Sequence, residues 1–117
     1  MRYVLFIYTN EADRPAWGTP EGDAEFKAYD AFHGEVTKRD VFRGGDPLVR
    51  VAEAKSVRVR NGGSQIADGP AVQTSEQLGG YYLLDCNDEA EALELAARIP
   101  GASYGTIEVR PVLELPG

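Results

Sequence analysis

The chain begins with a run of apolar residues that has the length of a β-strand. Between residues 2 and 8 the apolar side chains fall on both alternating faces: Tyr3, Leu5 and Ile7 on one, Val4, Phe6 and Tyr8 on the other. Two apolar faces are typical of a strand in a sheet that is covered on both sides. We therefore predict a buried strand here.

A helical pattern follows over residues 20–39. Thr19 suits the N-cap, Pro20 the first helical position and Glu21 the acidic first turn. Apolar and aromatic side chains then recur three and four residues apart on one side, with the single histidine among them: Phe26, Tyr29, Phe32, His33 and Val36. This spacing predicts an amphipathic helix.

The middle of the chain alternates short β-like runs with turn residues. We predict strands near 45–51, 55–60 and 64–67, and "VRVR" followed by "NGG" indicates a hairpin between the last two. Residues 72–80 have the composition of one helical turn that Gly79 and Gly80 would end.

The last third of the chain predicts a strand, a helix and a strand. The run "GYYLLDC" favours a strand, and Asn87 or Asp88 can cap the next helix. In the final strand Ile107 and Val109 point to one side and polar residues to the other. The apolar positions of the helix are Ala92, Leu95, Ala96 and Ile99.

The order of these elements is strand, helix, strand with hairpin, strand, helix, strand. It matches the ferredoxin-like split βαβ pattern of an α+β domain, here with an added hairpin. Two helices cover only one face of such a sheet, so the other apolar face needs a cover. A second copy packed sheet against sheet is the economical solution, and we predict a homodimer.

Length, charge and cysteine content narrow the class of protein. A chain of 117 residues predicts one domain, residues 1–117. The net charge of −7, without a basic cluster, argues against nucleic-acid binding. No apolar run is long enough for a membrane span. The lone Cys86 cannot form a disulfide within the chain, which fits a reducing, cytoplasmic location.

The stretch "ADGPAVQTSEQLGGYYLLDCNDEAEALELAARIP", followed by "YGTIEVRPVLEL", resembles the YCII-related superfamily and specifically its DGPF-domain branch. The similarity extends to "RYVLFIY", "FKAYDAFHGEV" and "VRVRNG", so it covers nearly the whole chain. It implies a dimeric α+β barrel of ferredoxin-like protomers in a bacterium, often encoded near or fused to extracytoplasmic-function sigma factors. It implies no established reaction.

The chain departs from this branch in the loop that names it. Asp68, Gly69 and Pro70 are present, but Ala71 stands where the branch typically has phenylalanine. The glutamate and the lysine that typically follow are replaced by Gln73 and Ser75, while Glu76 is kept. The motif therefore supplies only part of the charge it has elsewhere in the branch.

Two residues are candidates for acid–base chemistry. His33 is the only histidine and the natural group to titrate near neutral pH. Asp68 begins the "DGP" turn and could act as a carboxylate at the edge of a cleft. Each has a structural alternative: His33 as a packed residue of the helix, and Asp68 as a residue that bonds the backbone of its own turn.

A second candidate group consists of polar residues on predicted strands: Arg58, Arg60, Tyr81, Glu108 and Arg110. If they line the space between two sheets, they could bind a small organic anion. The alternative is a ladder of surface ion pairs, which contributes little.

Two functions follow from these observations, and neither requires a cofactor. No glycine pair has the context of a phosphate-binding loop, and no residues have metal-ligand spacing. The first function is a homodimer that binds a small organic ligand, or a regulatory partner such as the sigma factor that the family association suggests. The second is a small acid–base enzyme of the dimeric α+β barrel kind, acting on an aromatic or carboxylated metabolite through His33 and Asp68. The altered loop favours binding.

Overall fold

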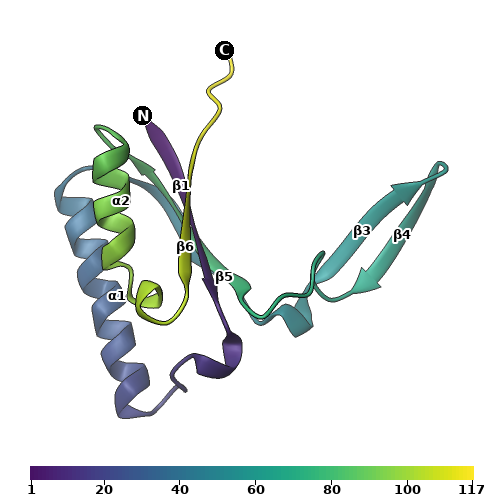
Figure 1. Ribbon diagram of the computed structural model, residues 1–117, viewed down its shortest axis with the longest axis horizontal. Helices are drawn as coiled ribbons and strands as arrows, with labels where there is room; N and C mark the ends of the chain where they lie inside the picture. The colour runs from purple at the N-terminus through teal and green to yellow at the C-terminus, as the bar shows by residue number, and fades with distance from the viewer.

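The computed structural model describes residues 1–117 and has two layers, a four-stranded antiparallel sheet and a pair of helices on one of its faces (Figure 1). The strand order is β2-β5-β1-β6, which is the order of the predicted ferredoxin-like α+β fold. The sheet strands are β1 (Arg2–Thr9), β2 (Phe42–Pro47), β5 (Gln77–Asp85) and β6 (Thr106–Pro111), and the helices are α1 (Pro20–Lys38) and α2 (Glu89–Arg98).

The central strand β1 is covered on one side only. Tyr3, Leu5 and Ile7 are buried under the helices, whereas Val4 and Phe6 on the other face are half-buried. The sequence predicted cover on both faces, and the second face has none within the single chain.

Both helices begin at side-chain caps. The Thr19 hydroxyl accepts a hydrogen bond from the Gly22 amide at 3.1 Å, and the Asp88 carboxylate accepts one from the Glu91 amide at 2.9 Å. The sheet-facing positions of α2 are buried as predicted: Ala92, Leu95 and Ala96, with Ile99 just beyond the helix.

The apolar side of α1 is narrower than predicted. Phe32 and Val36 are buried and Tyr29 packs beside them, but Phe26 is 64% exposed and His33 is also exposed. A helix buries about one residue per turn on the line that faces the sheet, so residues one position off that line turn outward.

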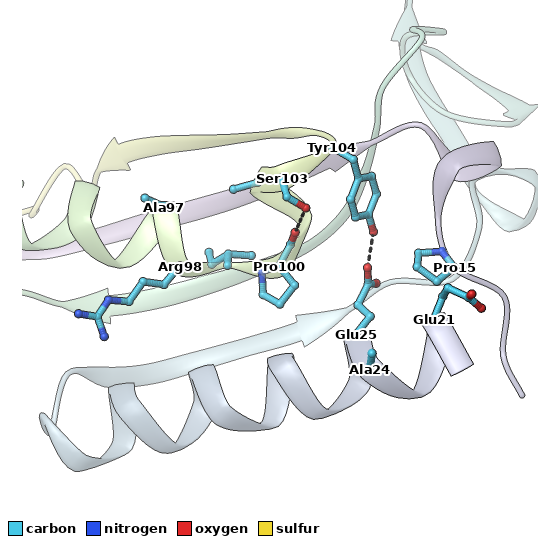
Figure 2. A pocket seen from close by; sticks show the side chains of 11 residues that line it. Pro15, Glu21, Ala24, Glu25, Ala97, Arg98, Pro100, Ser103 and Tyr104 are labelled. Atoms are coloured by element: carbon cyan, nitrogen blue, oxygen red, sulfur yellow. Dashed lines mark hydrogen bonds between the residues drawn. The ribbon is translucent and has the colours of Figure 1, made fainter. Parts of the chain in front are cut away.

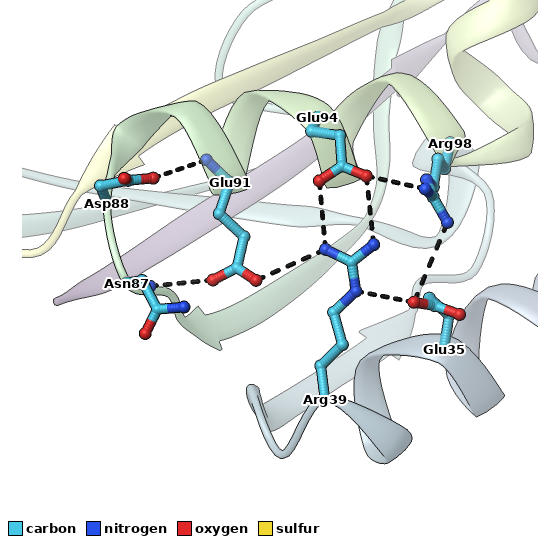
Figure 3. A network of polar contacts seen from close by, with 7 residues as sticks. All are labelled: Glu35, Arg39, Asn87, Asp88, Glu91, Glu94 and Arg98. Carbon is cyan, nitrogen blue, oxygen red and sulfur yellow. Dashed lines mark hydrogen bonds and ion pairs between the residues drawn. The ribbon is translucent and has the colours of Figure 1, made fainter.

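An ion-pair network joins the two helices at one end (Figure 3). The Arg39 guanidinium lies 2.6 Å from a carboxylate oxygen of Glu35 and 3.1 Å from one of Glu94. Arg98 bridges the same two carboxylates from α2, at 2.7 Å to Glu94 and 3.9 Å to Glu35. The network ties α1 to α2 through charged atoms at the surface.

The middle of the chain differs from the prediction in two places. Strand β2 begins earlier than predicted, at Phe42 instead of near residue 45. The helical turn predicted within 72–80 is absent, because Gln77–Gly80 belongs to β5 and pairs with β1. Gly80 allows a close approach of β2 to β5, since a Cβ on it would lie 3.1 Å from the Asp46 carbonyl oxygen.

The predicted hairpin forms, and it projects away from the two-layered body (Figure 1). It consists of β3 (Lys55–Arg60) and β4 (Gly63–Asp68), a separate two-stranded sheet. Asn61 and Gly62 turn the chain with φ of 53° and 77°, the left-handed conformation that a tight hairpin turn needs. Three short 3-10 helices complete the chain: Glu11–Asp13, Val51–Glu53 and Pro100–Ser103.

Candidate functional site

The sheet face opposite the helices has an apolar centre and polar edges. Phe6 lies directly opposite Tyr81 of β5 on one side and Glu108 of β6 on the other, and Tyr81 lies opposite Asp46 of β2. Directly paired residues in antiparallel strands point to the same face. A row therefore crosses all four strands on this bare face: Asp46, Tyr81, Phe6 and Glu108.

A parallel row runs beside the first. Val4 lies opposite Leu83 of β5 and Arg110 of β6, and Leu83 lies opposite Gly44 of β2. The two rows together place Val4, Phe6, Leu83 and the Tyr81 ring on the two central strands, and the outer strands add the charged groups of Asp46, Glu108 and Arg110. A surface of this kind suits a ligand or partner with an apolar body and polar ends.

The polar edge groups hold one another in place. The Tyr81 hydroxyl donates a hydrogen bond of 2.8 Å to the Asp46 carboxylate, and that bond, with the charge of Asp46, raises the pKa of Tyr81. On the opposite edge the Arg110 guanidinium lies 3.4 Å from the Glu108 carboxylate. Of the five residues predicted to bind a ligand, Tyr81, Glu108 and Arg110 are thus brought to one face.

A pocket of about 490 Å³ opens at the end of this face, where the chain returns from the hairpin. The Thr106 hydroxyl donates to the Glu76 carboxylate at 2.9 Å, which ties the returning loop to β6. Tyr8 and Ser75 each add a hydroxyl to the wall of the pocket. The pocket is lined by Tyr8, Thr74, Ser75, Glu76, Thr106 and Glu108.

Sequence reasoning identified only part of this pocket. It named Glu108 as a site residue and noted that Glu76 keeps its charge, but it missed Tyr8, Thr106 and the hydroxyls of the loop. Tyr8 and Thr106 are directly paired across β1 and β6. The period-2 pattern does put Tyr8 on the same face as Phe6, so that signal was present in the sequence.

The structure does not bring the two predicted acid–base residues together. His33 is exposed on α1, with its ring edge-on to that of Phe42 at a centroid distance of 4.8 Å, and no carboxylate lies within ion-pair distance of it. Asp68 ends β4 at the base of the projecting hairpin, exposed and paired with Lys55. Neither residue lines the pocket at the end of the sheet.

The two remaining predicted ligand residues, Arg58 and Arg60, also lie on the hairpin. The Arg58 guanidinium donates to the Ala71 carbonyl at 3.1 Å, and that of Arg60 donates to the Val59 carbonyl at 3.0 Å. Both therefore belong to a different sheet from Tyr81, Glu108 and Arg110.

A larger groove, of about 680 Å³, lies between α1 and the end of α2 (Figure 2). Across it the Tyr104 hydroxyl donates a hydrogen bond of 2.8 Å to the Glu25 carboxylate. Burial, this hydrogen bond and the charge of Glu25 raise the pKa of Tyr104. Arg98 is engaged by Glu94 and Glu35. The bare face is the stronger candidate, because its polar edges flank apolar side chains that no helix covers, those of Val4, Phe6 and Leu83.

Neither depression has the donor set of a metal site. No three histidine, cysteine, aspartate or glutamate side chains gather in a way that could hold a metal ion. None of the helices combines the length and the apolar character needed to cross a membrane.

Comparison with known proteins identifies the family. The family model for the YCII-related domain matches residues 1–116. An uncharacterised protein of Rhizobium meliloti (strain 1021) is 32% identical over 114 residues, which is 96% of this chain and 92% of that protein. Because the family match covers nearly every residue of this ferredoxin-like chain, the chain belongs to the YCII-related domain family.

Proposed function

We propose that this YCII-family protein is a cytoplasmic homodimer that binds a small organic molecule between the bare faces of its two sheets. The observation that carries the proposal is the row from Asp46 to Glu108, with Phe6 at its centre and hydrogen-bonding groups at its ends. An apolar surface of this kind needs a cover, and a closed two-fold pair of identical faces provides one.

The exposed area of the single chain supports the dimer. A folded monomer of 12.7 kDa is expected to expose about 6,200 Å², whereas this chain exposes 7,918 Å². The excess is about 1,700 Å² per chain, or about 3,400 Å² for a pair, which lies in the range of obligate homodimer interfaces. Only 15 of the 117 residues are buried, which leaves a small core for an isolated chain.

The polar groups of the bare face suggest the class of ligand. Arg110 is the cation that could bind a carboxylate, while Tyr81, Tyr8 and the hydroxyls of the pocket could bind neutral polar groups. A small molecule with an apolar body and an anionic or hydroxylated end fits this combination. A regulatory protein such as a sigma factor would compete for the same face.

The contacts of His33 and Asp68 favour binding over the acid–base alternative. An acid–base pair needs its two groups within hydrogen-bonding reach of one substrate. His33 has no carboxylate partner, and Asp68 is engaged by Lys55. We also assign the chain to the DGPF-type branch, because Asp68, Gly69 and Pro70 form the turn at the end of β4, with φ of 101° at Gly69.

A thermal-shift screen of small carboxylates, phenols and polyols tests the proposal. A ligand at about one hundred times its dissociation constant stabilises the folded state by about 2.7 kcal/mol, which raises the Tm by on the order of 10 °C. The same compound should stabilise the Tyr8→Phe and Arg110→Gln variants less, and the Asp30→Asn variant on α1 as much as the original. If no compound raises the Tm, or if all variants respond equally, the site is wrong.

A further inference from the structure

One side of the hairpin β3–β4 is apolar and exposed. Val57 lies directly opposite Ile66, and Val59 follows two residues along on the same side. Val57 is 62% exposed, Val59 is 61% exposed and Ile66 is 71% exposed. A two-stranded hairpin is marginally stable alone, and it becomes stable when its apolar side packs against another element. Within the chain no element provides that packing.

The hairpin is held by hydrogen bonds at its base. The Ser56 hydroxyl donates to the Gly69 carbonyl and the Gly69 amide to the Ala54 carbonyl, both at 2.8 Å. The Glu11 carboxylate, just after β1, accepts from the Val51 amide at 2.9 Å, and so fixes where the chain leaves the body. These bonds fix the base of the hairpin, and its two strands point away from the four-stranded sheet (Figure 1).

The charge of the hairpin is opposite to that of the rest of the chain. Residues 55–68 carry three cations, Lys55, Arg58 and Arg60, against the single carboxylate of Asp68, which gives a net charge of +2. Since the whole chain carries −7, the remainder carries −9. The hairpin of one copy is therefore electrostatically complementary to the body of another.

The shape of the chain agrees with an extended arm. Its radius of gyration is 16.2 Å, whereas a compact domain of this length is expected to have one of about 13 Å. The bare sheet face and the hairpin lie on the same side of the sheet, away from the helices (Figure 1). A second copy docked on the bare face would therefore approach the hairpin as well.

We propose that the hairpin β3–β4 is an exchanged arm: in the homodimer, the side that carries Val57, Val59 and Ile66 packs against the body of the second copy. The inference rests on the proposed homodimer. It adds that the dimer is held by two surfaces, the sheet faces and the arms. Arg58 and Arg60 point to the other side of the hairpin, the side of Gln65, and therefore lie outside this contact.

Matched substitutions on the two sides of the hairpin test the arm. Ile66→Lys places a charge on the apolar side, and Gln65→Lys places the same charge on the neighbouring residue, which points to the opposite side. Both positions are exposed in the single chain, so neither substitution should unfold it. Sedimentation equilibrium should show that Ile66→Lys raises the dimer dissociation constant at least tenfold and that Gln65→Lys changes it by no more than about threefold.

Hydrogen exchange gives a second readout on the unaltered protein. Amides of residues 55–68 should exchange slowly at concentrations where the dimer forms and rapidly on dilution to monomer. The arm is overturned if the protein is dimeric but Ile66→Lys dimerises like the original, or if exchange of the hairpin is independent of concentration. A protein that is monomeric at every concentration would overturn the proposed homodimer itself, and the arm with it.

Discussion

Phe6 of β1 lies directly opposite Tyr81 of β5 on the sheet face that the helices leave bare, and both side chains are half-buried. The next residue along β1 towards the N-terminus, Leu5, is completely buried on the helix side. The two faces of one strand thus differ because one is packed within the chain and the other is not. The exposed apolar face is the structural reason for expecting a second copy.

The Arg39 network predicts a dependence of stability on pH. Hydrogen bonds from Arg39 hold the pKa of Glu35 and of Glu94 below the ordinary value of 4.5. A lowered carboxyl pKa contributes stability above the unfolded-state value, and that contribution is lost as the pH falls through the folded-state value. Arg39→Gln should therefore lower the urea midpoint at pH 7 and have a much smaller effect near pH 3.

The control for this prediction is Lys38→Gln, which removes a neighbouring charge that forms no ion pair in the network. Its effect at pH 7 should be small, because exposed unpaired charges contribute little. Equal losses for the two variants at both pH values would show that Arg39 acts through its aliphatic stem or through helix propensity instead of the ion pairs.

Gly105 is predicted to be intolerant of any side chain. A Cβ at this position would lie 2.2 Å from the Tyr8 carbonyl oxygen and 2.8 Å from a methyl carbon of Thr9. Gly105→Ala should lower the free energy of unfolding by about 1–3 kcal/mol through overpacking, measured by urea denaturation.

At Gly34, by contrast, the same substitution to alanine is predicted to be tolerated. It lies on the exposed side of α1, and a Cβ added to it would meet no other atom within 4 Å. Gly34→Ala should stabilise the protein by up to about 1 kcal/mol, because alanine is the better helix former. A destabilised Gly34→Ala, or an unaffected Gly105→Ala, would contradict the packing described for these two positions.

Cys86 is predicted to be unreactive in the folded protein. Its side chain is 2% exposed, and burial, followed by the charge of Glu91, raises the pKa of the thiol to about 11. At pH 8 the thiol is therefore protonated as well as inaccessible, and the thiolate is the reactive form. Labelling with a chromogenic disulfide reagent should be on the order of a hundredfold slower than in denaturant; equal rates would contradict the burial.

Local patterns in the sequence predicted the framework well. The N-caps at Thr19 and Asp88, the turn at Asn61 and Gly62, and the buried positions of α2 each follow from a few neighbouring residues. These features depend on chemistry within one element, so they can be inferred without knowledge of the fold.

Features that depend on distant partners were predicted less well. Gly79 and Gly80 suggested the end of a helix, but they belong to β5, because the pairing of this strand with β1 and β2 outweighs the local turn preference. His33 has the spacing of the apolar stripe, yet it is exposed beside Phe42. The separation of Arg58 and Arg60 from the other polar strand residues depends on the hairpin leaving the sheet, and no local pattern reveals that.

Sedimentation velocity tests the central claim most directly, with Phe6→Lys on the bare face and Phe26→Lys on the exposed side of α1 as a matched pair. At micromolar concentration the original protein and Phe26→Lys should sediment with twice the chain mass of 12.7 kDa, and Phe6→Lys should sediment as a folded monomer. A monomeric original protein, or a Phe6→Lys variant that stays as dimeric as Phe26→Lys, would contradict the pairing of the two bare sheet faces.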